Sequence, residues 1–463
     1  MLRRRHHGRA SAGTVAGARV SIGGARVWTT GAMVAAAALA VGQAGASPAP
    51  AAPASAFSGV ASPSCGPVEY GGSGSPAAVV VSDLPMVGGS QERSRQMVAA
   101  IRLVLADRAW RAGPTPVGYQ ACNDALASTG AWDPAQCTAN AGAYAGNPSV
   151  LGVVGTYNSG CAALIIPVLN RSATAMVSPG NTLVCLTLAS PGCPAGQPRG
   201  LYPSGRRTYA RVVPNDAYQG AGLATFARRR RVRRPFVLYA AKDPTSLGQA
   251  RTFRGASRAL GARVVGFRAW DPKARGYRRL LRGVKRRHPD AVVLAGLIEE
   301  NGGRLIRDKV AVLGPNAGPV RLLAPDGFAQ QSTIKLAGRA ARGMFVSLPG
   351  RDPAHLTGAG RTLERRLARQ VAPRPVEPFA PYAGQALGVL LDAVARGGGS
   401  RAGAASALLG VRVRHGILGS FGFLASGDPT VGPISVYRAA GTLRFAAEVV
   451  PQRRVVSAAR AGR

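Results

Sequence analysis

The chain has 463 residues, of which 46% are hydrophobic, and its 59 basic and 20 acidic residues give a net charge of +39. This length allows two domains with buried cores, and the hydrophobic content excludes global disorder. The positive charge indicates a nucleic-acid partner, an anionic polymer of the cell envelope or an arginine-biased genome.

The N-terminal segment has the organisation of a signal peptide. The first 27 residues contain six Arg, two His and no acid, and an apolar stretch from Gly31 to Ala46 follows them. We expect residues 1–46 to be the signal peptide and residues 47–75, rich in Ala, Pro, Ser and Gly, to be a linker. Cys65 lies well beyond the apolar stretch, so we expect an exported protein, periplasmic or extracellular, that is soluble rather than lipid-anchored.

The six cysteines all lie between residues 65 and 193, and none has the paired spacing of a zinc site. For an exported protein this favours disulfides, and six cysteines allow about 15 pairings. The short segments between them suggest Cys185 with Cys193 and Cys122 with Cys137. Elimination then leaves Cys65 with Cys161.

Apolar strands alternate with amphipathic helices along the rest of the chain. A β-branched run, 78–85, precedes a helical pattern over 94–108, in which Met97, Ile101, Val104 and Leu105 share one face. The predicted strands that follow are 116–120, 150–155, 235–240, 263–269 and 291–296, and the predicted helices are 135–146, 161–171, 252–260, 277–287 and 301–314. This alternation predicts parallel sheets, and the number of units favours two doubly wound, Rossmann-like lobes over one large sheet.

Several long stretches resemble the type I periplasmic solute-binding proteins, especially the branched-chain amino acid and amide binders of ABC importers. They are GVVGTYNSGCAALIIPVLN from Gly152, ATAMVSPGNTLVCLT from Ala173, YARVVPNDAYQGAGLATFA from Tyr209, YAGQALGVLLDAVARGG from Tyr382 and the closing FGFLASGDPTVGPISVYRAAGTLRF from Phe421. The resemblance spans about Val79 to Phe445, in the family's order.

The resemblance implies two lobes joined by a hinge of three crossovers near residues 211–216, 343–350 and 420–428. Lobe 1 is then expected over 76–212 plus 348–420, lobe 2 over 213–347 plus 421–450, and a basic tail over 451–463. The implied function is capture of a small solute, an amino acid or amide, by closure of the lobes, with delivery to an ABC transporter permease.

The predicted ligand loops of lobe 1 follow two strands. Tyr157, Asn158 and Ser159 precede a helix, where free backbone N–H groups and the positive end of the helix dipole suit a carboxylate. Gly180 and Thr182 lie in the next loop, where Gly permits close approach and the Thr hydroxyl can bond the amino end of the solute. The alternatives are that Ser159 caps the helix and that residues 178–181 form an ordinary turn.

In lobe 2, Asp326 follows a strand and resembles the family's acidic partner of the ammonium group; a plain turn beside Gly327 is the alternative. The segment Lys242 to Ala250 departs from the family, whose members carry an aromatic cover in a Tyr-Gly-x-Gly loop. Tyr218, Tyr239 and Phe328 are candidates for a substitute cover.

Other function classes are disfavoured by the sequence. The three histidines outside the predicted signal peptide, His288, His355 and His415, are scattered and lack a catalytic or metal-binding frame, so we expect no enzyme, metal or cofactor. The Arg runs at 228–234 and 285–287 end helices without a nucleic-acid-reading module, so a nucleic-acid partner is not expected. We expect a monomer; a ligand-sensing receptor component or an envelope-associated binding protein without a transport role remain the alternatives.

Overall fold

The computed structural model describes residues 57–462, so the predicted signal peptide and residues 47–56 lie outside the described range. Two β-sheets dominate the described chain, and helices cover both faces of each. The expected class, an α/β protein with two doubly wound lobes, is confirmed. We call the six-stranded sheet with its helices the first lobe and the seven-stranded sheet with its helices the second lobe.

The first sheet is parallel except at one edge, where β2 runs antiparallel to β3. Its spatial order is β2 (Arg111–Ala112), β3 (Thr115–Asn123), β1 (Ala78–Leu84), β6 (Val150–Gly155), β7 (Ala175–Ser178) and β8 (Tyr209–Arg211). The order of the strands reverses between β1 and β6. Ligands of doubly wound sheets bind at such switch points, beyond the carboxyl ends of the strands.

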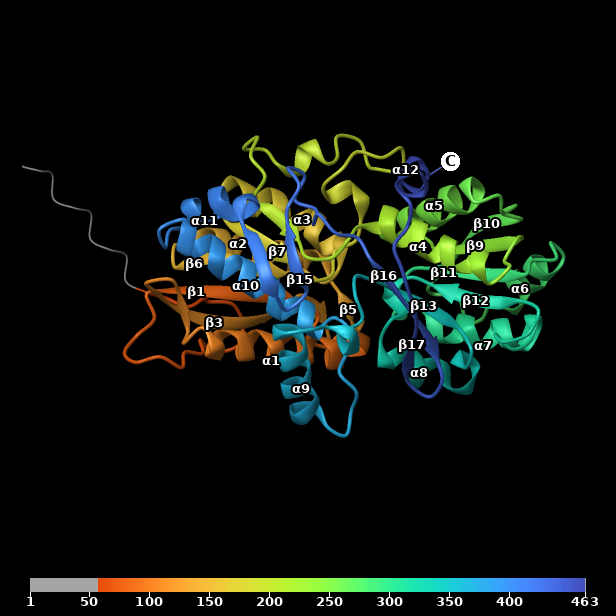
Figure 1. The fold of residues 1–463 in the computed structure, drawn as a ribbon, viewed down its shortest axis with the longest axis horizontal. Coiled ribbons are helices and arrows are strands. Elements are labelled where there is room, and N and C mark those ends of the chain that lie inside the picture. The colour runs from red at the N-terminus through yellow and green to blue at the C-terminus, as the bar shows by residue number, and fades with distance from the viewer. Residues whose placement is uncertain (1–56, 463) are drawn as a thin grey trace, which may run out of the picture. The chain divides into compact units, whose positions relative to one another are not determined.

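The second sheet has five parallel strands and an antiparallel hairpin at one edge. Its spatial order is β10 (Gly266–Trp270), β9 (Pro235–Ala240), β11 (Ala291–Ala295), β12 (Arg321–Ala324), β13 (Phe345–Pro349), β16 (Ile434–Ala439) and β17 (Leu443–Val449). The chain order reverses between β9 and β11. Figure 1 labels these strands together with the helices that cover them.

The helices pack in groups on the faces of the sheets. Those of the first lobe are α1 (Gln91–Asp107), α2 (Pro134–Gly146), α3 (Ser159–Arg171), α9 (Ala359–Val371), α10 (Ala380–Arg396) and α11 (Arg401–Ala407). Those of the second lobe are α4 (Asp216–Arg229), α5 (Pro244–Ala259), α6 (Arg278–Lys285), α7 (Gly302–Leu313), α8 (Gln331–Ala337) and α12 (Arg453–Ala461). Two short hairpins, β4 (Ala125–Leu126) with β5 (Ala131–Trp132) and β14 (Arg412–Gly416) with β15 (Gly419–Gly422), complete the regular structure.

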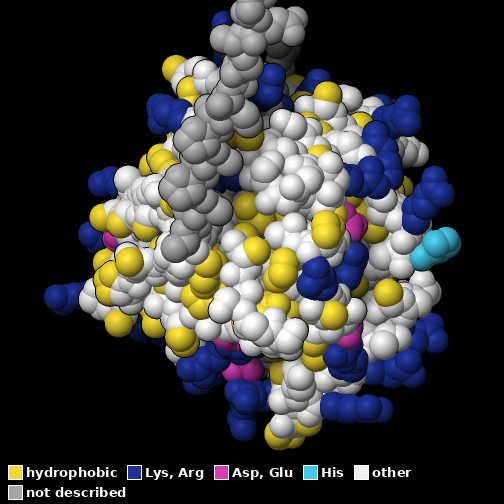
Figure 2. All heavy atoms as spheres, turned by 90° about the vertical axis from the view of Figure 1, so that its left-hand side faces the viewer, with side chains coloured by type: hydrophobic (Ala, Val, Ile, Leu, Met, Phe, Trp, Pro, Cys, Tyr) yellow, Lys and Arg dark blue, Asp and Glu magenta, His cyan; other side chains and the backbone are white. Residues whose placement is uncertain are grey.

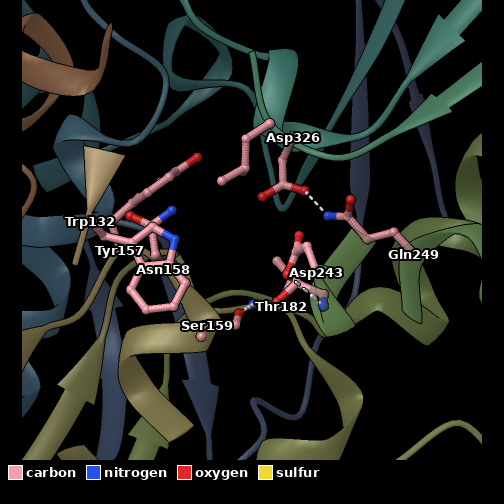
Figure 3. A pocket seen from close by; sticks show the side chains of 12 residues that line it. Trp132, Tyr157, Asn158, Ser159, Thr182, Asp243, Gln249 and Asp326 are labelled. Atoms are coloured by element: carbon pink, nitrogen blue, oxygen red, sulfur yellow. Dashed lines mark hydrogen bonds between the residues drawn. The ribbon is translucent and has the colours of Figure 1, made fainter. Parts of the chain in front are cut away.

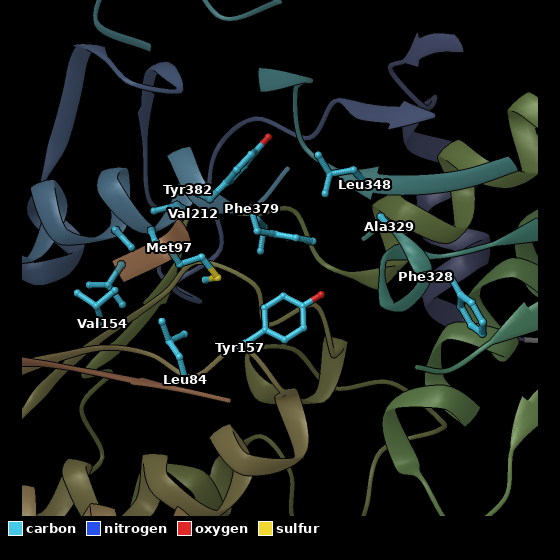
Figure 4. Packing of buried hydrophobic residues seen from close by; sticks show 14 of the residues in the cluster. Leu84, Met97, Val154, Tyr157, Val212, Phe328, Ala329, Leu348, Phe379 and Tyr382 are labelled. Carbon is cyan, nitrogen blue, oxygen red and sulfur yellow. The ribbon is translucent and has the colours of Figure 1, made fainter. Parts of the chain in front are cut away.

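Strand β1 shows why the first sheet is covered on both sides. All seven of its residues are buried, and they alternate between two cores because successive side chains of a strand point to opposite faces. Val80 and Leu84 pack on the side of α1 and α10, whereas Val79 and Val81 pack on the side of α2 and α3. Figure 4 shows Leu84 in the first of these cores.

The chain passes between the sheets repeatedly. After β8 it leaves the first sheet and enters α4, which packs on the second sheet. After β13 it returns to α9 and α10, which pack beside α1, and after β15 it enters β16 of the second sheet.

Residues 57–75, expected to be linker, instead pack on the first lobe. The side chain of Val60 is 5% exposed, and its backbone N–H donates to Gln120 Oε1. Glu69 exchanges two backbone hydrogen bonds with Tyr119, at 2.8 and 2.9 Å, so this segment lies against β3. Composition predicted a linker because this stretch has few large apolar residues; backbone pairing and a disulfide fix it instead.

The expected bridge between Cys185 and Cys193 is present, but the other two pairings were wrong. Cys122, at the end of β3, bonds to Cys65 of the adjoining N-terminal segment. Cys137 on α2 bonds to Cys161 on α3, because these two helices pack side by side on one face of the sheet. Spacing along the chain favoured Cys122 with Cys137, although the two residues lie on different layers of the lobe.

The expected basic tail is also structured. Residues 453–461 form α12, which packs against α4 and α5, with Val455 and Ala459 buried in the core of the second lobe. Between residues 57 and 462, no helix has both the length and the apolar character needed to span a bilayer.

Positive charge is spread along the margin of the face drawn in Figure 2. On the face drawn in Figure 2, Lys and Arg side chains lie along most of the margin, while Asp and Glu side chains are few. On this face, the Lys and Arg side chains are arranged as separate solvated charges and do not form one continuous basic surface for binding a polyanion.

Candidate functional site

One cavity is formed where the carboxyl ends of strands from both sheets meet. Its walls come from the residues after β6, β7, β9, β11 and β12, together with β5. They are Trp132, Tyr157, Asn158, Ser159, Gly160, Gly180, Thr182, Asp243, Thr245, Gln249, Leu297 and Asp326. Atom-free space there amounts to about 360 Å³, part of it open to solvent. In Figure 3, Trp132, Tyr157 and Asn158 lie across this space from Asp326 and Gln249.

On the first-lobe wall, Ser159 joins the two predicted ligand loops. Its Oγ accepts hydrogen bonds from the backbone N–H groups of Thr182 and Leu183, both at 3.2 Å. The N-cap of α3 is Asn158, so the alternative that the Ser159 side chain caps this helix does not apply. The proton of the Ser159 hydroxyl has no acceptor among residues 57–462, and the first N–H groups of α3 lack partners within the helix.

Tyr157 is buried beside the cavity, and its ring is fixed on two sides. The guanidinium carbon of Arg93 lies 3.7 Å from the ring centroid, and Phe379 packs edge-on at 5.2 Å. Arg93 also donates a hydrogen bond to the Tyr157 hydroxyl. Burial raises the pKa of this hydroxyl, so Tyr157 is a neutral group at physiological pH.

Gly180 allows the second loop to lie against the Tyr157 ring. A Cβ at position 180 would be 2.6 Å from Tyr157 Cδ2. Gly180 was expected to let the solute approach the backbone closely. In the structure it is the Tyr157 ring, on the same wall, that approaches Gly180 closely. The hydroxyl of Ser178 accepts from the N–H groups of Gly180 and Asn181, which holds the loop in a turn.

On the second-lobe wall, Asp326 presents a buried carboxylate. Its side chain is 4% exposed, and its Oδ1 accepts from Gln249 Nε2 at 2.9 Å. Figure 3 shows the other carboxylate oxygen directed into the cavity. Burial raises the pKa of Asp326 to about 6, so the group is still mainly ionised at neutral pH.

Two more acids lie behind this wall and are neutral at pH 7. Burial, together with the charge of Asp326, raises the pKa of Asp216 to about 8. Burial, together with the charge of Asp243, raises the pKa of Glu300 to about 8. Asp243 and Asp326 are the carboxyl groups that line the cavity, whereas Asp216 and Glu300 do not line it.

The lobes also touch directly beside the cavity. Ser90, just before α1, donates a hydrogen bond of 2.6 Å to Glu299 Oε1 of the second lobe. Arg93 donates to the same Ser90 hydroxyl at 2.6 Å and lies 4.0 Å from the Glu299 carboxylate. These contacts join the lobes without occupying the cavity.

The structure brings all six predicted ligand residues to this one cavity: Tyr157, Asn158, Ser159, Gly180, Thr182 and Asp326. Sequence reasoning missed Trp132, Asp243, Thr245 and Gln249. Asp243 and Gln249 lie in the segment recognised as a departure from the family, which was the available signal. Trp132 lies in a two-residue strand, which has no periodic pattern to detect.

The three aromatic residues considered as a cover do not line the cavity. Phe328 is fully buried, Tyr239 packs on Phe267 with ring centroids 5.0 Å apart, and Tyr218 lines a different groove. Trp132 and Tyr157 supply the aromatic surface instead.

Asp124, Cys137 and Cys161 are the one group of metal-ligating residue types that clusters between residues 57 and 462. Their potential ligand atoms lie within 4.8 Å of one another, but both cysteines are disulfide-bonded. Thiolate, not disulfide, is the ligand form of cysteine, so the arrangement does not fit a metal centre.

Two doubly wound sheets, joined by repeated crossings and enclosing a polar cavity, define a class of two-lobed binding proteins. The sequence profile of the family described as "Periplasmic binding protein" matches residues 85–442, and the chain belongs to this family. Among proteins of curated function, no sequence match is found.

Solved structures share the fold at low sequence identity. A leucine-binding protein from Thermotoga maritima superposes with a TM-score of 0.69 at 21% identity, covering 81% of this chain and 99% of that one. A branched-chain amino acid binding protein from Streptococcus pneumoniae, in complex with isoleucine, gives 0.67 at 14% identity and covers 81% and 99%. A solute-binding protein of an ABC transporter from R. palustris, in complex with benzoate, gives 0.65 at 15% identity and covers 81% and 96%.

Proposed function

We propose that this protein captures a small solute of the amino acid or amide class between its lobes outside the cytoplasm and delivers it to an ABC transporter permease. The observation that carries the proposal is the opposite hydrogen-bonding character of the two cavity walls. The first-lobe wall offers donors: the Ser159 hydroxyl and the N–H groups at the start of α3. The second-lobe wall offers acceptors: the carboxylates of Asp243 and Asp326.

A zwitterion matches both walls at once. Its carboxylate meets the N-terminus of α3, where unpaired N–H groups and the helix dipole favour negative charge. Its ammonium group meets Asp326, whose second oxygen is directed into the cavity (Figure 3). An aromatic acid such as benzoate has no cation for Asp326, so this charge disfavours it.

Closure of the lobes follows from the same arrangement. The solute contacts both walls only when the lobes are together, so binding shifts the population toward the closed form. The Ser90–Glu299 bond closes the edge of the cleft in that form.

Export is supported by the N-terminal sequence and by the disulfides. Basic residues followed by an apolar stretch precede the folded chain, and the structure contains three disulfides, which persist in oxidising compartments. Delivery to a permease is drawn from relatives whose names place them in ABC transporters.

A thermal-shift screen tests the proposal. The purified protein is heated with amino acids, amides, urea and aromatic acids at low and moderate salt. A rise in Tm with one small zwitterion, equal at both salt concentrations, is the expected result, because a ligand of the native state stabilises it by mass action. A shift with aromatic acids alone, or with no small solute, contradicts the proposal.

A further inference from the structure

The cavity contains more negative charge than one ammonium group neutralises. Asp243 and Asp326 line it, and no Lys, Arg or His among residues 57–462 does so. The chain has 59 basic and 20 acidic residues, so charged residues drawn at random from it would line a cavity mostly with basic side chains. The acidic lining of this cavity is the opposite of that expectation.

Asp243 is the N-cap residue of α5. Its carboxylate accepts hydrogen bonds from the backbone N–H groups of Thr245 and Ser246, both at 3.0 Å. An N-cap carboxylate is stabilised by these donors and by the positive end of the helix dipole. Glu300 lies nearby, and its own burial, followed by the charge of Asp243, raises the pKa of Glu300 to about 8.

The basic side chains of Arg93 and Lys242 do not line the cavity and so do not pair with its carboxylates. The Arg93 guanidinium is bound to Tyr157, to Ser90 and to the region of Glu299, and it does not line the cavity. Lys242 precedes Asp243, but its side chain is exposed to solvent.

A further acceptor in the same wall lacks a donor. Gln249 is 5% exposed and its Nε2 donates one hydrogen bond to Asp326, while its Oε1 has no hydrogen-bond partner among residues 57–462. The Gln249 amide therefore contributes to the site by holding the Asp326 carboxylate in place.

We propose that the solute carries two cationic groups, an α-ammonium group at Asp326 and a second cation at Asp243, and so belongs to the basic amino acids. This inference rests on the proposed function and specifies its substrate class. Trp132 on the opposite wall offers an apolar face for the methylene groups between the two cations.

Calorimetric titration of the purified full-length protein with lysine and with norleucine tests the inference. Norleucine has the same carbon skeleton and lacks the terminal ammonium group. We expect lysine to bind at least about tenfold more tightly, because the second cation meets a preorganised carboxylate. Equal or tighter binding of norleucine overturns the inference and leaves the proposed function intact. Binding of no amino acid overturns both.

Two matched variants locate the effect. Asp243→Asn keeps an N-cap side chain, so α5 is retained, while the charge is lost. We expect it to lower the affinity for lysine by about tenfold or more and to change that for norleucine by less than about threefold. Asp271→Asn makes the same change at an exposed position after β10 and should alter neither affinity. Equal weakening of lysine and norleucine by Asp243→Asn assigns Asp243 a structural role only and contradicts the inference.

Discussion

Arg211 and Asp428 form a buried ion pair, with 2.8 Å between Arg211 Nε and Asp428 Oδ1 and side-chain exposures of 0% and 5%. Arg211 ends β8, where the chain leaves the first sheet, and Asp428 lies in the segment that leads to β16 of the second sheet. The Nη1 atom of Arg211 donates to the carbonyls of Asn181 and Leu183, both at 3.0 Å. One guanidinium group thus connects two crossovers to the loop that contributes Gly180 and Thr182 to the cavity.

This ion pair should be a large single contribution to stability. Replacing Asp428 by Asn leaves the buried charge of Arg211 without its counter-ion, and we expect the free energy of unfolding to fall by about 3–5 kcal/mol. Urea unfolding followed by circular dichroism measures it. The double variant Arg211→Met with Asp428→Leu should lose less than the sum of the single variants; strict additivity would show that the two residues are not coupled.

Replacing Ser159 by Ala removes the acceptor shared by two backbone N–H groups. We expect the free energy of unfolding to fall by about 1–3 kcal/mol, because both N–H groups are buried. Solute affinity should fall as well, since the Ser159 hydroxyl is a donor of the first-lobe wall. Calorimetry and urea unfolding separate the two effects. Ser172→Ala, at the half-buried C-cap of α3, is the control for affinity, and an unchanged affinity in Ser159→Ala would remove Ser159 from the site.

Stability should decrease as the pH rises from about 5 to 8. Burial raises the pKa of Asp216 and Glu300 to about 8 and that of Glu377 to about 7, whereas their ordinary values are 3.8 for Asp and 4.5 for Glu. The folded state therefore binds more protons than the unfolded state in this interval, and the stabilisation is lost as the pH rises through the folded-state pKa values. The pKa of Asp428 is lowered, so this group makes stability depend on pH only below the ordinary pKa of Asp, outside the interval from 5 to 8.

Thermal unfolding between pH 4.5 and 8.5 measures this dependence. Asp216→Asn should flatten the profile, because one of the protons taken up on folding is removed. A Tm that rises with pH across this interval would contradict the assignment of these acids as neutral groups.

The contact between Ser90 and Glu299 should favour the closed form. Removing the Glu299 carboxylate by substitution with Ala deletes the acceptor of the 2.6 Å bond from Ser90 and the negative charge 4.0 Å from Arg93. We expect a larger radius of gyration for the solute-free protein in small-angle scattering and about tenfold weaker solute binding.

Asp392→Ala is a suitable control for this variant. Asp392 pairs with Arg108 at 3.0 Å within the first lobe, so its removal changes charge without touching the second lobe. If the Glu299→Ala variant has an unchanged radius of gyration and unchanged solute affinity, the Ser90–Glu299 bond does not influence closure.

Six of the residues that line the cavity were predicted from the family resemblance together with their positions after strands. The carboxyl ends of parallel strands lie at one edge of a sheet, so residues distant in the chain, such as Ser159 and Asp326, meet there once the strand order is known. Strand and helix spacing was also sufficient for the fold class, since buried β-branched runs and amphipathic helices have distinct periods.

The errors concern contacts that spacing does not encode. Cys122 and Cys137 are close in sequence but belong to a strand and a helix, and each bonds to a cysteine of a different neighbour. The segment around Val60 and the short helix α12 contain few large apolar residues, and both are stabilised by the lobe on which they pack. Asp243 was missed as a site residue because an N-cap Asp has the same local pattern whether or not it lines a cavity.

The most direct test of the central claim is a calorimetric comparison of one amino acid with its deaminated acid and its decarboxylated amine. The two walls of the cavity offer donors and acceptors respectively, so the account predicts that the amino acid binds with 1:1 stoichiometry and that loss of either charged group weakens binding by about tenfold or more. Binding of the deaminated acid as tight as that of the amino acid would contradict it, because Asp326 would then face no cation.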